Sequence, residues 1–311
     1  MSLISICIPA FNEESCIETT VTCVEETMKA IKEYDYEIII ADNDSKDKTR
    51  EILRKICTRN PKVKAIFNSR NFGPERSGRN AMRNASGDAV VVITADMQDP
   101  PEMILEFVKY WEKGEKIVLG QKVSSELGVI NRGLRNLYYR IVDAFSDVPQ
   151  YHQVTGFGIY DRAVVNQLNN IVSTETALRH QLAELGYKAR LVPYTQNKRL
   201  GGKSSYNLFS SLDYGIMSLC TTSRKPLRLM TLVGVILSFL CLCVGMYYLV
   251  NKLINWYTFD AGFAPIILGV FFLGSVQIVF LGLIGEYIGI ISEKLRLSQL
   301  PLVTEDERIN F

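Results

Sequence analysis

Three short acidic segments contain the side chains that are best suited to chemistry. They are Pro9–Glu14 (PAFNEE), Asp42–Asp47 (DNDSKD) and Thr94–Asp99 (TADMQD). None contains cysteine or histidine, and such carboxylates suit a hard cation like Mg²⁺ or Mn²⁺, which prefers oxygen ligands and often keeps substrate phosphates as further ligands. Each aspartate taken alone has another explanation, as a helix cap or a turn residue. Three such segments at one edge of a sheet would instead form a metal-assisted site.

Glycine-rich phosphate loops do not occur in the sequence. Neither G-x-G-x-x-G nor GxxxxGK[ST] is found. A bound nucleotide would therefore hold its phosphates through the metal and through basic side chains. This favours a nucleotide-sugar site over an NAD or ATP site.

Hydrophobic periodicity predicts the elements that would position these segments. Leu3–Ile8 is continuously apolar, as in a buried parallel strand, and apolar residues recur at helical spacing from Ile17 to Ile31. The resulting βαβαβαβ order predicts an α/β fold with a mostly parallel sheet, helices on both faces and ligands beyond the carboxyl ends of the strands. The other predicted elements are strands at Glu37–Ala41, Val63–Phe67 and Ala89–Thr94, and helices at Thr49–Ile56 and Glu75–Asn84.

After Pro101 the regular alternation of strands and helices loosens. We expect helices at Asn131–Val142 and Thr174–Leu185, and strands at Gln153–Tyr160 and Lys188–Val192. The glycine-rich, basic segment that follows, KRLGGKSSY, is typical of a mobile loop.

Two long apolar segments argue against a wholly soluble protein. Leu229–Asn251 and Ala261–Gly285 contain no charged residue, and 23 helical residues span about 34 Å, enough to cross the hydrocarbon core of a bilayer. Two buried core helices are the alternative explanation. The net charge of the chain is only +2, which gives no overall attraction to nucleic acid.

The basic residues predict how the chain crosses the membrane. Arg224, Lys225 and Arg228 precede the first apolar segment, and Lys294 and Arg296 follow the second, so the positive-inside rule places both ends in the cytosol. We therefore expect an integral membrane protein with two spans, in the inner or plasma membrane if the source is a bacterium. The predicted parts are a cytosolic domain (1–207), a membrane-surface amphipathic helix with a basic linker (208–228), two transmembrane helices (about 229–251 and 261–286, within 229–292) and a cytosolic tail (293–311).

The cysteines and the amino terminus fit a cytosolic domain. The seven cysteines form no CxxC pair, so we expect free thiols and neither a zinc site nor a disulfide framework. The first residues lack the basic region of a secretory signal. Small residues in the second apolar segment permit close helix packing, and with it a homo-oligomer.

Eight short segments carry a resemblance to a known family. The chain resembles glycosyltransferase family 2, in the polyprenyl-phosphate branch that includes dolichol-phosphate mannose synthases. The resemblance implies a Rossmann-like GT-A domain joined to a two-helix transmembrane hairpin, Mg²⁺ or Mn²⁺ as cofactor, and transfer of a sugar from a nucleotide diphosphate to a lipid phosphate. The matching segments are ISICIPAFNEE, EIIIADNDSKDKT, RNFG, ASGDAVVVITADMQDPPEMI, YDRAVV, RLGGKSSY, PLRL and LGLIGEYIG.

The resemblance also implies roles for individual residues. Asp96 and Gln98 match metal-binding positions, which makes Asp96 the principal catalytic residue. Asp42 would hydrogen-bond the base or ribose, and Arg199 lies on a loop that closes over the diphosphate. The full donor-binding set implied is Pro9, Phe11, Glu13, Asp42, Asn71, Ala95, Arg199 and Lys203.

Three positions depart from the family pattern. Thr94 stands where the family commonly has the first aspartate of Asp-Ala-Asp, which lowers the negative charge beside the metal. Gly156 stands where many members carry the aspartate of Gly-Asp-Phe-Arg. In the basic loop Ser205 replaces a lysine, for which Lys203 can compensate.

The acceptor decides whether the reaction needs a general base. A lipid phosphate is largely ionised at pH 7, because the second pKa of a phosphate monoester is about 6, so it needs none. Glu175 resembles the position of a base in other family 2 enzymes, although it also suits the amino-terminal end of a helix. Lys122, Arg132 and Arg135 are candidates to hold the acceptor phosphate, whereas the basic residues next to the apolar segments suit anionic lipid headgroups.

The sequence thus predicts an inverting, metal-dependent hexosyltransferase. It would move a sugar from a nucleotide diphosphate-sugar, a UDP-sugar in preference to GDP-mannose, to a polyprenyl phosphate on the cytosolic membrane face. One alternative is transfer to the hydroxyl of a lipid-linked saccharide during surface-glycan assembly, which would need a base such as Glu175. Another is a nucleotide-sugar-binding scaffold with a degenerate site, suggested by Thr94 and Gly156.

Overall fold

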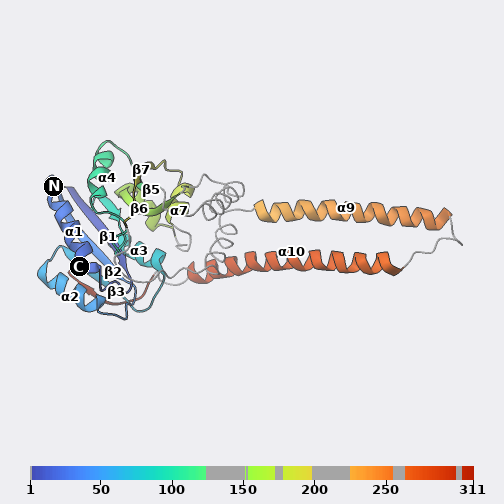
Figure 1. Ribbon diagram of the computed structural model, residues 1–311, viewed down its shortest axis with the longest axis horizontal. Coiled ribbons are helices and arrows are strands. Elements are labelled where there is room, and N and C mark those ends of the chain that lie inside the picture. The colour runs from blue at the N-terminus through green and yellow to red at the C-terminus, as the bar shows by residue number, and fades with distance from the viewer. Residues whose placement is uncertain are drawn as a thin grey trace. The chain divides into compact units, whose positions relative to one another are not determined.

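A computed structural model describes residues 2–123, 151, 153–171, 178–197, 225–254, 263–298 and 303–311. These residues fall into two compact units. The first contains the described part of residues 2–197 together with the carboxyl-terminal residues from 297 onward, and the second is the helical hairpin from 225 to 296. Figure 1 labels the helices and strands of both units.

The first unit is built on one sheet, whose described strands run in the order β7-β5-β6-β4-β1-β2-β3-β8. β1 pairs with β2 and β4 in parallel, and β2 pairs with β3 in parallel, which confirms the predicted mostly parallel α/β sheet. β6 runs antiparallel to both β4 and β5. The strands are β1 (Ser2–Ala10), β2 (Tyr34–Asp42), β3 (Val63–Asn68), β4 (Ala89–Val92), β5 (Ile117–Lys122), β6 (Val154–Asp161), β7 (Arg190–Tyr194) and β8 (Glu305–Ile309).

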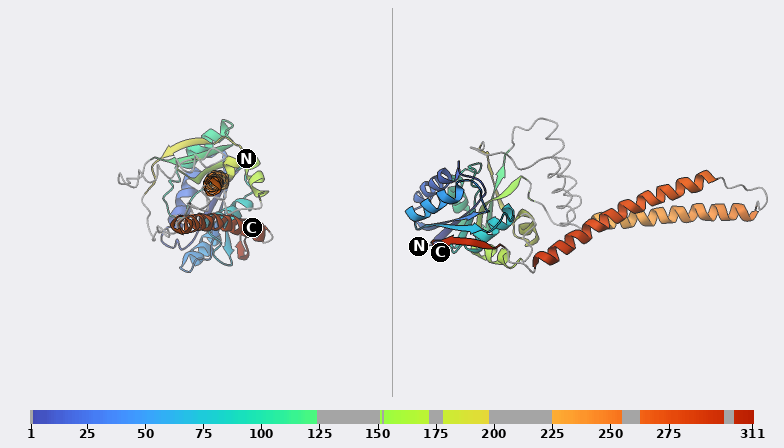
Figure 2. Two further views of the ribbon diagram at one scale, coloured as in Figure 1. Left: turned by 90° about the vertical axis from the view of Figure 1, so that its right-hand side faces the viewer. Right: turned by 90° about the horizontal axis from the view of Figure 1, so that it is seen from below.

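Helices cover both faces of this sheet (Figures 1 and 2). Alternation along β2 explains the two layers, because Ile38 and Ile40 enter one core while Ile39 and Ala41 enter the other. The first core includes side chains of α1 (Ile17–Lys29), α2 (Thr49–Arg59) and α4 (Met103–Glu112). The second includes side chains of α3 (Pro74–Arg83), α6 (Arg162–Asn169) and α7 (Leu178–Glu184).

The structure adds elements that the hydrophobic pattern did not predict. The strands and helices expected before residue 95 all form, with ends that differ by a few residues. Beyond Pro101 the alternation continues through α4 and β5 and includes the short helix α6, so the expected loosening was wrong for these residues. The helix expected at 131–142, the loop at 198–206 and residues 208–224 of the segment expected to hold the membrane-surface helix and basic linker lie outside the described residues.

The last strand, β8, follows the hairpin in sequence and pairs antiparallel with β3. Part of the segment expected to be a tail is therefore a strand of the sheet. Its side chains alternate between half-buried and exposed, as on a sheet edge. Glu307 accepts from Arg54 Nη2 at 2.7 Å, and Glu305 accepts from Asn80 Nδ2 at 2.7 Å. The chain thus returns to its first domain after both hairpin helices.

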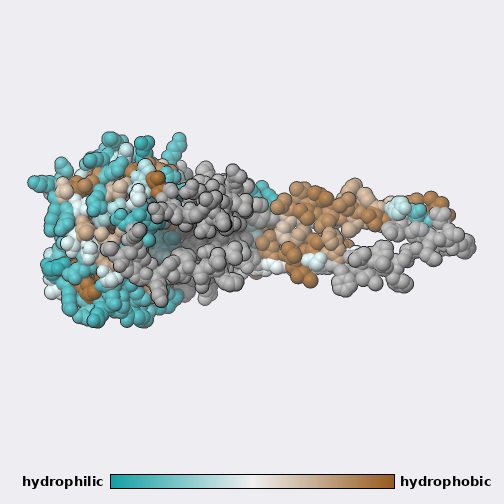
Figure 3. Space-filling view, in the orientation of Figure 1, coloured by the Kyte–Doolittle hydropathy of each residue, from teal (hydrophilic) through white to brown (hydrophobic). Residues whose placement is uncertain are grey.

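The second unit consists of α9 (Lys225–Ile254) and α10 (Phe263–Ser298). Both helices are long and apolar enough to cross a membrane, with candidate spans at Leu227–Tyr247 and Phe272–Ser292. Large apolar side chains are exposed along both, including Phe239 and Ile278, and Figure 3 shows the resulting hydrophobic surface. Among the described side chains of the two spans only Ile290 is buried, unlike in the core helix of a soluble protein. α9 extends three or four residues beyond each end of its predicted span, whereas α10 begins two residues later than predicted and ends twelve residues later.

Candidate active site

The carboxyl ends of β1, β2 and β4 bring the three acidic segments to one edge of the sheet. Ala10 pairs with Asp42, the last residue of β2, and Cys7 pairs with Val92 at the end of β4. The Asn43 amide also donates to the Ala10 carbonyl at 2.8 Å. The structure therefore places the residues predicted from these segments beside one another, as parallel strands require.

Side chains connect the first two acidic segments tightly. The Asn12 amide donates to Ser45 Oγ at 2.9 Å, and its side-chain Oδ1 accepts from the Lys46 amide at 2.8 Å. The Glu13 amide donates to Thr49 Oγ1 at 2.9 Å. Asn12 has a φ of 54°, a left-handed conformation that asparagine tolerates better than most residues. Glu13 is buried, whereas Phe11 is exposed and available to a ligand.

Asp42 is fully buried but only half satisfied. Its Oδ2 accepts from Arg50 Nε at 2.6 Å and from the Ser45 amide at 3.2 Å. Its Oδ1 is buried and has no hydrogen-bond partner in the part of the chain that the structure describes. A buried acceptor left unpaired costs about 1–3 kcal/mol, so an N–H or O–H donor arriving there would be stabilised.

An asparagine network supports the neighbouring turn. Asn43 Nδ2 donates to Asn71 Oδ1 at 2.8 Å, and Asn43 Oδ1 accepts from the Phe72 amide at 2.9 Å. Asn71 Oδ1 also accepts from the Gly73 amide, where a φ of 85° allows the chain to enter α3. Asn71, expected to bind the donor, thus shapes the turn that starts α3.

Asp96 lies just beyond β4 in a turn that its own carboxylate supports. Its Oδ1 accepts from Thr94 Oγ1 at 2.9 Å and from the Gln98 amide at 3.2 Å. Ala95 is buried, and its carbonyl accepts from Thr20 Oγ1 at 2.8 Å, so the predicted donor contact at Ala95 is held against α1. Asp96 and Gln98 both remain partly exposed.

Asp99 points inward, in contrast to Asp96. It is buried, and its Oδ1 accepts from Tyr194 OH at 2.6 Å. Burial raises the pKa of Asp99, against the hydrogen bonds from Tyr194 and Thr94. Burial also lowers the pKa of Lys122, although Asp99 and Asp96 oppose that shift. The charges of the two aspartates therefore act on Lys122, which is predicted to hold an acceptor phosphate.

The donor set fits a cation that shares its ligands with a substrate. Among residues whose positions are described, no group of three or more His, Cys, Asp or Glu residues is arranged to hold a metal. Asp96 and Gln98 offer one carboxylate and one amide oxygen. Mg²⁺ is commonly bound by one or two carboxylates together with substrate phosphates, so this pair fits a site completed by a diphosphate.

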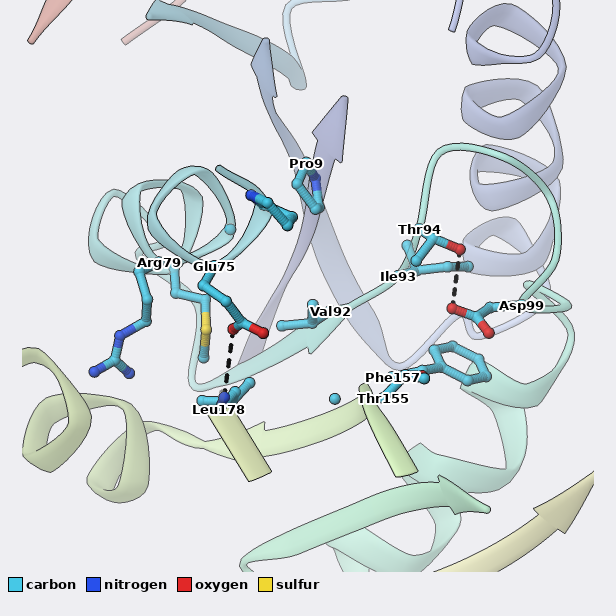
Figure 4. A pocket seen from close by; sticks show the side chains of 14 residues that line it. Pro9, Glu75, Arg79, Val92, Ile93, Thr94, Asp99, Thr155, Phe157 and Leu178 are labelled. Carbon is cyan, nitrogen blue, oxygen red and sulfur yellow. Dashed lines mark hydrogen bonds between the residues drawn. The ribbon is translucent and has the colours of Figure 1, made fainter. Parts of the chain in front are cut away.

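A cavity of about 130 Å³ is lined by Thr94, whose hydroxyl donates to Asp96, and by Asp99 (Figure 4). Pro9 and Thr94 line it, together with Glu75 from the first turn of α3 and Gly156 from β6. Gly156 has a φ of 97°, which favours glycine, and its carbonyl accepts from the buried Tyr160 hydroxyl at 2.6 Å. The glycine at the position of a family aspartate is therefore also a requirement of the local backbone.

Some predicted residues cannot be placed, and some contributors were missed. Glu175, Arg132, Arg135, Arg199 and Lys203 lie outside the described residues. Sequence reasoning did not find Arg50, Glu75 or Tyr194. Arg50 is eight residues after Asp42, close enough to be suspected as its partner, but Tyr194 contacts Asp99 across 95 residues and no local pattern connects them.

Comparison with known proteins identifies related sequences. Residues 5–169 match Glycosyl transferase family 2, and residues 225–291 match the GtrB C-terminal hairpin. The chain is 32% identical over 303 residues to the uncharacterized glycosyltransferase YkcC of Bacillus subtilis (strain 168), covering 96% of this chain and 92% of that protein. It is 27% identical over 308 residues to the bactoprenol glucosyl transferase of Shigella phage SfII, covering 99% of each.

A solved structure shares the fold of the first unit. It is glucosyl-3-phosphoglycerate synthase from Mycobacterium tuberculosis, crystallised with Mn²⁺ and uridine-diphosphate-glucose. The two superpose with a TM-score of 0.50 at 19% identity, covering 71% of this chain and 79% of that one. The likeness shows a GT-A-like α/β fold.

Proposed function

The chain belongs to glycosyl transferase family 2, and from this premise we propose that it transfers a sugar from a nucleotide diphosphate-sugar to a polyprenyl phosphate. The donor in this proposal is a UDP-sugar in preference to GDP-mannose, and the reaction inverts the anomeric centre. The bactoprenol glucosyl transferase relative supports both the lipid acceptor and a hexose, because bactoprenol is a polyprenyl lipid.

Asp42 would bind the nucleobase. Its Oδ1 lacks a partner among the described residues, while Arg50 and Ser45 fix the other oxygen. A ring N–H of uracil or guanine is a donor of the kind this oxygen needs. Phe11 lies in the same segment as Pro9 and Glu13. Its side chain is exposed and would cover the base.

Asp96 and Gln98 would hold the divalent cation. When bound, Mg²⁺ or Mn²⁺ supplies Lewis-acid stabilisation of the negative charge on the departing diphosphate, worth several kcal/mol. Asp96 keeps its carboxylate at the carboxyl end of β4 through its hydrogen bonds with Thr94 and the Gln98 amide. The diphosphate would therefore lie between Asp96 and the base site at Asp42.

A phosphate acceptor agrees with the residue at position 156. Gly156 supplies no carboxylate to act as a base, and an ionised lipid phosphate needs none. Lys122 lies close enough to Asp96 and Asp99 to feel their charges, where it could receive the acceptor phosphate. Arg132, Arg135, Arg199 and Lys203 stay predicted contributors from outside the described residues.

The carboxyl-terminal strand supports the proposed topology. β8 follows α10 but pairs with β3 of the first unit. If α9 and α10 each cross the bilayer once, both ends of the hairpin must face the same compartment, because one sheet contains residues from before and after it. This agrees with the positive-inside prediction of a cytosolic catalytic domain and cytosolic termini, in a bacterial inner or plasma membrane.

The combination of an acidic sheet edge with a two-helix hairpin in one chain carries this proposal. The test uses purified full-length protein, polyprenyl phosphate, Mn²⁺ and a mixed pool of nucleotide sugars, with mass spectrometry of the lipid. A lipid heavier by one hexosyl group attached through phosphate is the expected product. A sugar added only to a lipid-linked saccharide would favour the hydroxyl-acceptor alternative, and nucleotide binding without any product would favour the scaffold.

A further inference from the structure

The cavity lined by Thr94 and Asp99 has the size of a monosaccharide site. Its volume of about 130 Å³ is about ten times the space that one buried water needs. It lies between α3, β4 and β6, and Thr94 connects its wall to Asp96 through the hydrogen bond from Thr94 Oγ1. A sugar attached to a diphosphate held at Asp96 would therefore reach this cavity without leaving the site.

The walls of the cavity suit neutral hydroxyl groups. Figure 4 shows the Glu75 carboxylate on one side and the Thr94–Asp99 pair on the other, with apolar side chains such as Val92 and Phe157 between them. Carboxylates and a threonine hydroxyl accept hydrogen bonds from sugar hydroxyls, and apolar surfaces cover C–H faces. Two carboxylates on opposite walls disfavour a phosphate in the same space.

Arg79, a cationic side chain at the cavity, does not make the cavity more suitable for a phosphate than for neutral hydroxyl groups. Arg79 lines the cavity, but its guanidinium turns toward α6, where Nη2 donates to the Leu168 carbonyl at 2.7 Å. Burial lowers the pKa of Arg79 to about 10, which still leaves it charged at neutral pH. Its charge is therefore directed at a backbone carbonyl and away from Thr94 and Asp99.

The structure orients Glu75 across the cavity. Its Oε2 accepts from the Leu178 amide at 3.3 Å, which ties the first turn of α3 to the start of α7 (Figure 4). Gly156 lines the cavity opposite Leu178 and adds no side chain to it, since a Cβ there would lie in ordinary contact with Leu178 Cδ2 at 3.5 Å. The carboxylate of Glu75 and the absence of a side chain at Gly156 thus define the same space.

We propose that Glu75 is a specificity-determining residue that accepts hydrogen bonds from hydroxyl groups of the transferred sugar, and that the cavity between α3, β4 and β6 is the sugar subsite. The inference rests on the proposed function, because it requires a nucleotide diphosphate-sugar at Asp42 and Asp96. The inference adds the protein side chain that distinguishes one donor sugar from another. Glu75 is a donor-binding residue in this account and takes no part in breaking the glycosidic bond.

The test compares Glu75→Gln with the wild type and with Glu51→Gln, a control on an exposed carboxylate of α2 that pairs with Lys55. Each purified full-length protein is assayed with UDP-glucose, UDP-galactose, UDP-N-acetylglucosamine, UDP-xylose and GDP-mannose, and binding of the free nucleotide diphosphate is measured separately. For the preferred donor, Glu75→Gln should lower kcat/KM by about 10- to 100-fold, as expected for a lost hydrogen bond to a charged group. Free nucleotide binding should change less than about twofold.

A deoxy analogue of the preferred donor makes the test specific. If Glu75 contacts the missing hydroxyl, Glu75→Gln should cost little further activity with that analogue. Equal losses with all donors and with free nucleotide would assign Glu75 a structural role through Leu178 and overturn the inference. Wild-type protein that binds neither UDP nor GDP would instead contradict the proposed function itself.

A second variant tests the subsite without changing Glu75. Leu178→Phe enlarges an apolar side chain that lines the cavity. It should reduce turnover of hexose donors more than of UDP-xylose, which lacks the C6 hydroxymethyl group. An unchanged ratio between the two donors, with the variant folded, would place the sugar elsewhere and overturn the proposal.

Discussion

Two buried carboxylates on β2 show how differently one strand uses its two ends. Glu37 lies near the amino end, where its Oε1 accepts from Ser5 and Ser86 and its Oε2 accepts from Lys64 Nζ at 2.7 Å. Asp42 lies at the carboxyl end, where Oδ2 is paired and Oδ1 has no partner within the described chain. Both charges are equally hidden from water, but only Glu37 is satisfied by the protein alone.

The difference separates stability from function. When a buried charge is fully paired, removing one of its partners lowers the stability of the protein. When one of its oxygens is unpaired, a ligand that donates a hydrogen bond to that oxygen gains binding free energy. The same contrast holds around the carboxyl edge as a whole. Asp99 is enclosed by Tyr194 and Thr94, while Asp96 stays partly exposed. Substitutions at the two ends of the strands should therefore have independent effects on stability and on ligand binding.

The largest effect is expected at the carboxyl end, from Asp96→Ala. Loss of the carboxylate that holds the cation should lower sugar transfer by at least about 1,000-fold, since a bound metal contributes several kcal/mol of charge stabilisation. The partly exposed position predicts little change in thermal stability. Assays across a range of Mn²⁺ concentrations, with thermal unfolding as the control, check this. Full activity in the folded variant would contradict the role of Asp96.

At the amino end, Glu37→Ala should lower the free energy of unfolding and leave the affinity for nucleotide unchanged. Removing one partner of a buried ion pair leaves Lys64 uncompensated and should cost about 3 kcal/mol. Denaturant unfolding of the full-length protein measures the loss, and titration with UDP measures binding to the folded fraction. Weaker UDP binding with unchanged stability would contradict the assignment of stability to the amino end of β2 and of ligand binding to its carboxyl end.

The stability contribution of Glu37 should depend on pH. Burial acts to raise the pKa of Glu37, but hydrogen bonds from Lys64, Ser5 and Ser86 outweigh it and hold the pKa below its ordinary value of 4.5. A lowered folded-state pKa stabilises the protein above pH 4.5, and that stabilisation is lost as the pH falls through the folded-state pKa. The stability difference between wild type and Glu37→Ala should therefore be full at pH 7 and shrink below pH 4.5. A difference that grows in acid would exclude this explanation.

Asp42→Asn should weaken nucleotide binding by about 10- to 100-fold, because an amide cannot present a charged acceptor to the base. The asparagine keeps the size of the side chain and an oxygen that can still accept from Arg50, so the protein should fold with reduced stability. Isothermal titration with UDP and with GDP measures the effect, and Glu51→Gln on the surface of α2 is the matched control. Equal affinities in variant and wild type would remove Asp42 from the base site.

The smallest effect is expected at the carboxyl-terminal strand. Arg54 and Glu307 form an ion pair at 2.7 Å, but both side chains are nearly half exposed. Glu307→Ala should therefore cost less than about 1 kcal/mol and leave nucleotide affinity unchanged. Thermal unfolding checks the first point and UDP titration the second. A large loss of stability or of UDP affinity would mean that β8 supports the site more directly than its edge position indicates.

Sequence reasoning predicted the part of the fold that local patterns determine. Continuous apolar strands and helical spacing placed β1 to β4 and the helices between them, and the parallel-strand rule brought Asp42 and Asp96 to one edge. The sequence did not predict β8, because four of the five residues of EDERI are charged and the segment becomes a strand only through pairing with β3, far away in sequence.

The site could likewise be predicted only where its residues belong to a local sequence motif. Asp42, Asp96 and Gln98 follow from motif and position. Glu75 was read as the first residue of a predicted helix, because nothing local shows that Leu178, 103 residues later, lies opposite it. Gly156 was read as a missing acid, but only the positive φ reveals that the backbone itself requires glycine there.

The most direct test of the central claim is a cryo-EM structure of the full-length protein with a UDP-sugar and Mn²⁺. The account predicts a ring N–H of the base within hydrogen-bond distance of Asp42 Oδ1, and the cation and diphosphate beside Asp96 and Gln98. A nucleotide bound elsewhere, with Asp42 Oδ1 still unpaired, would contradict it.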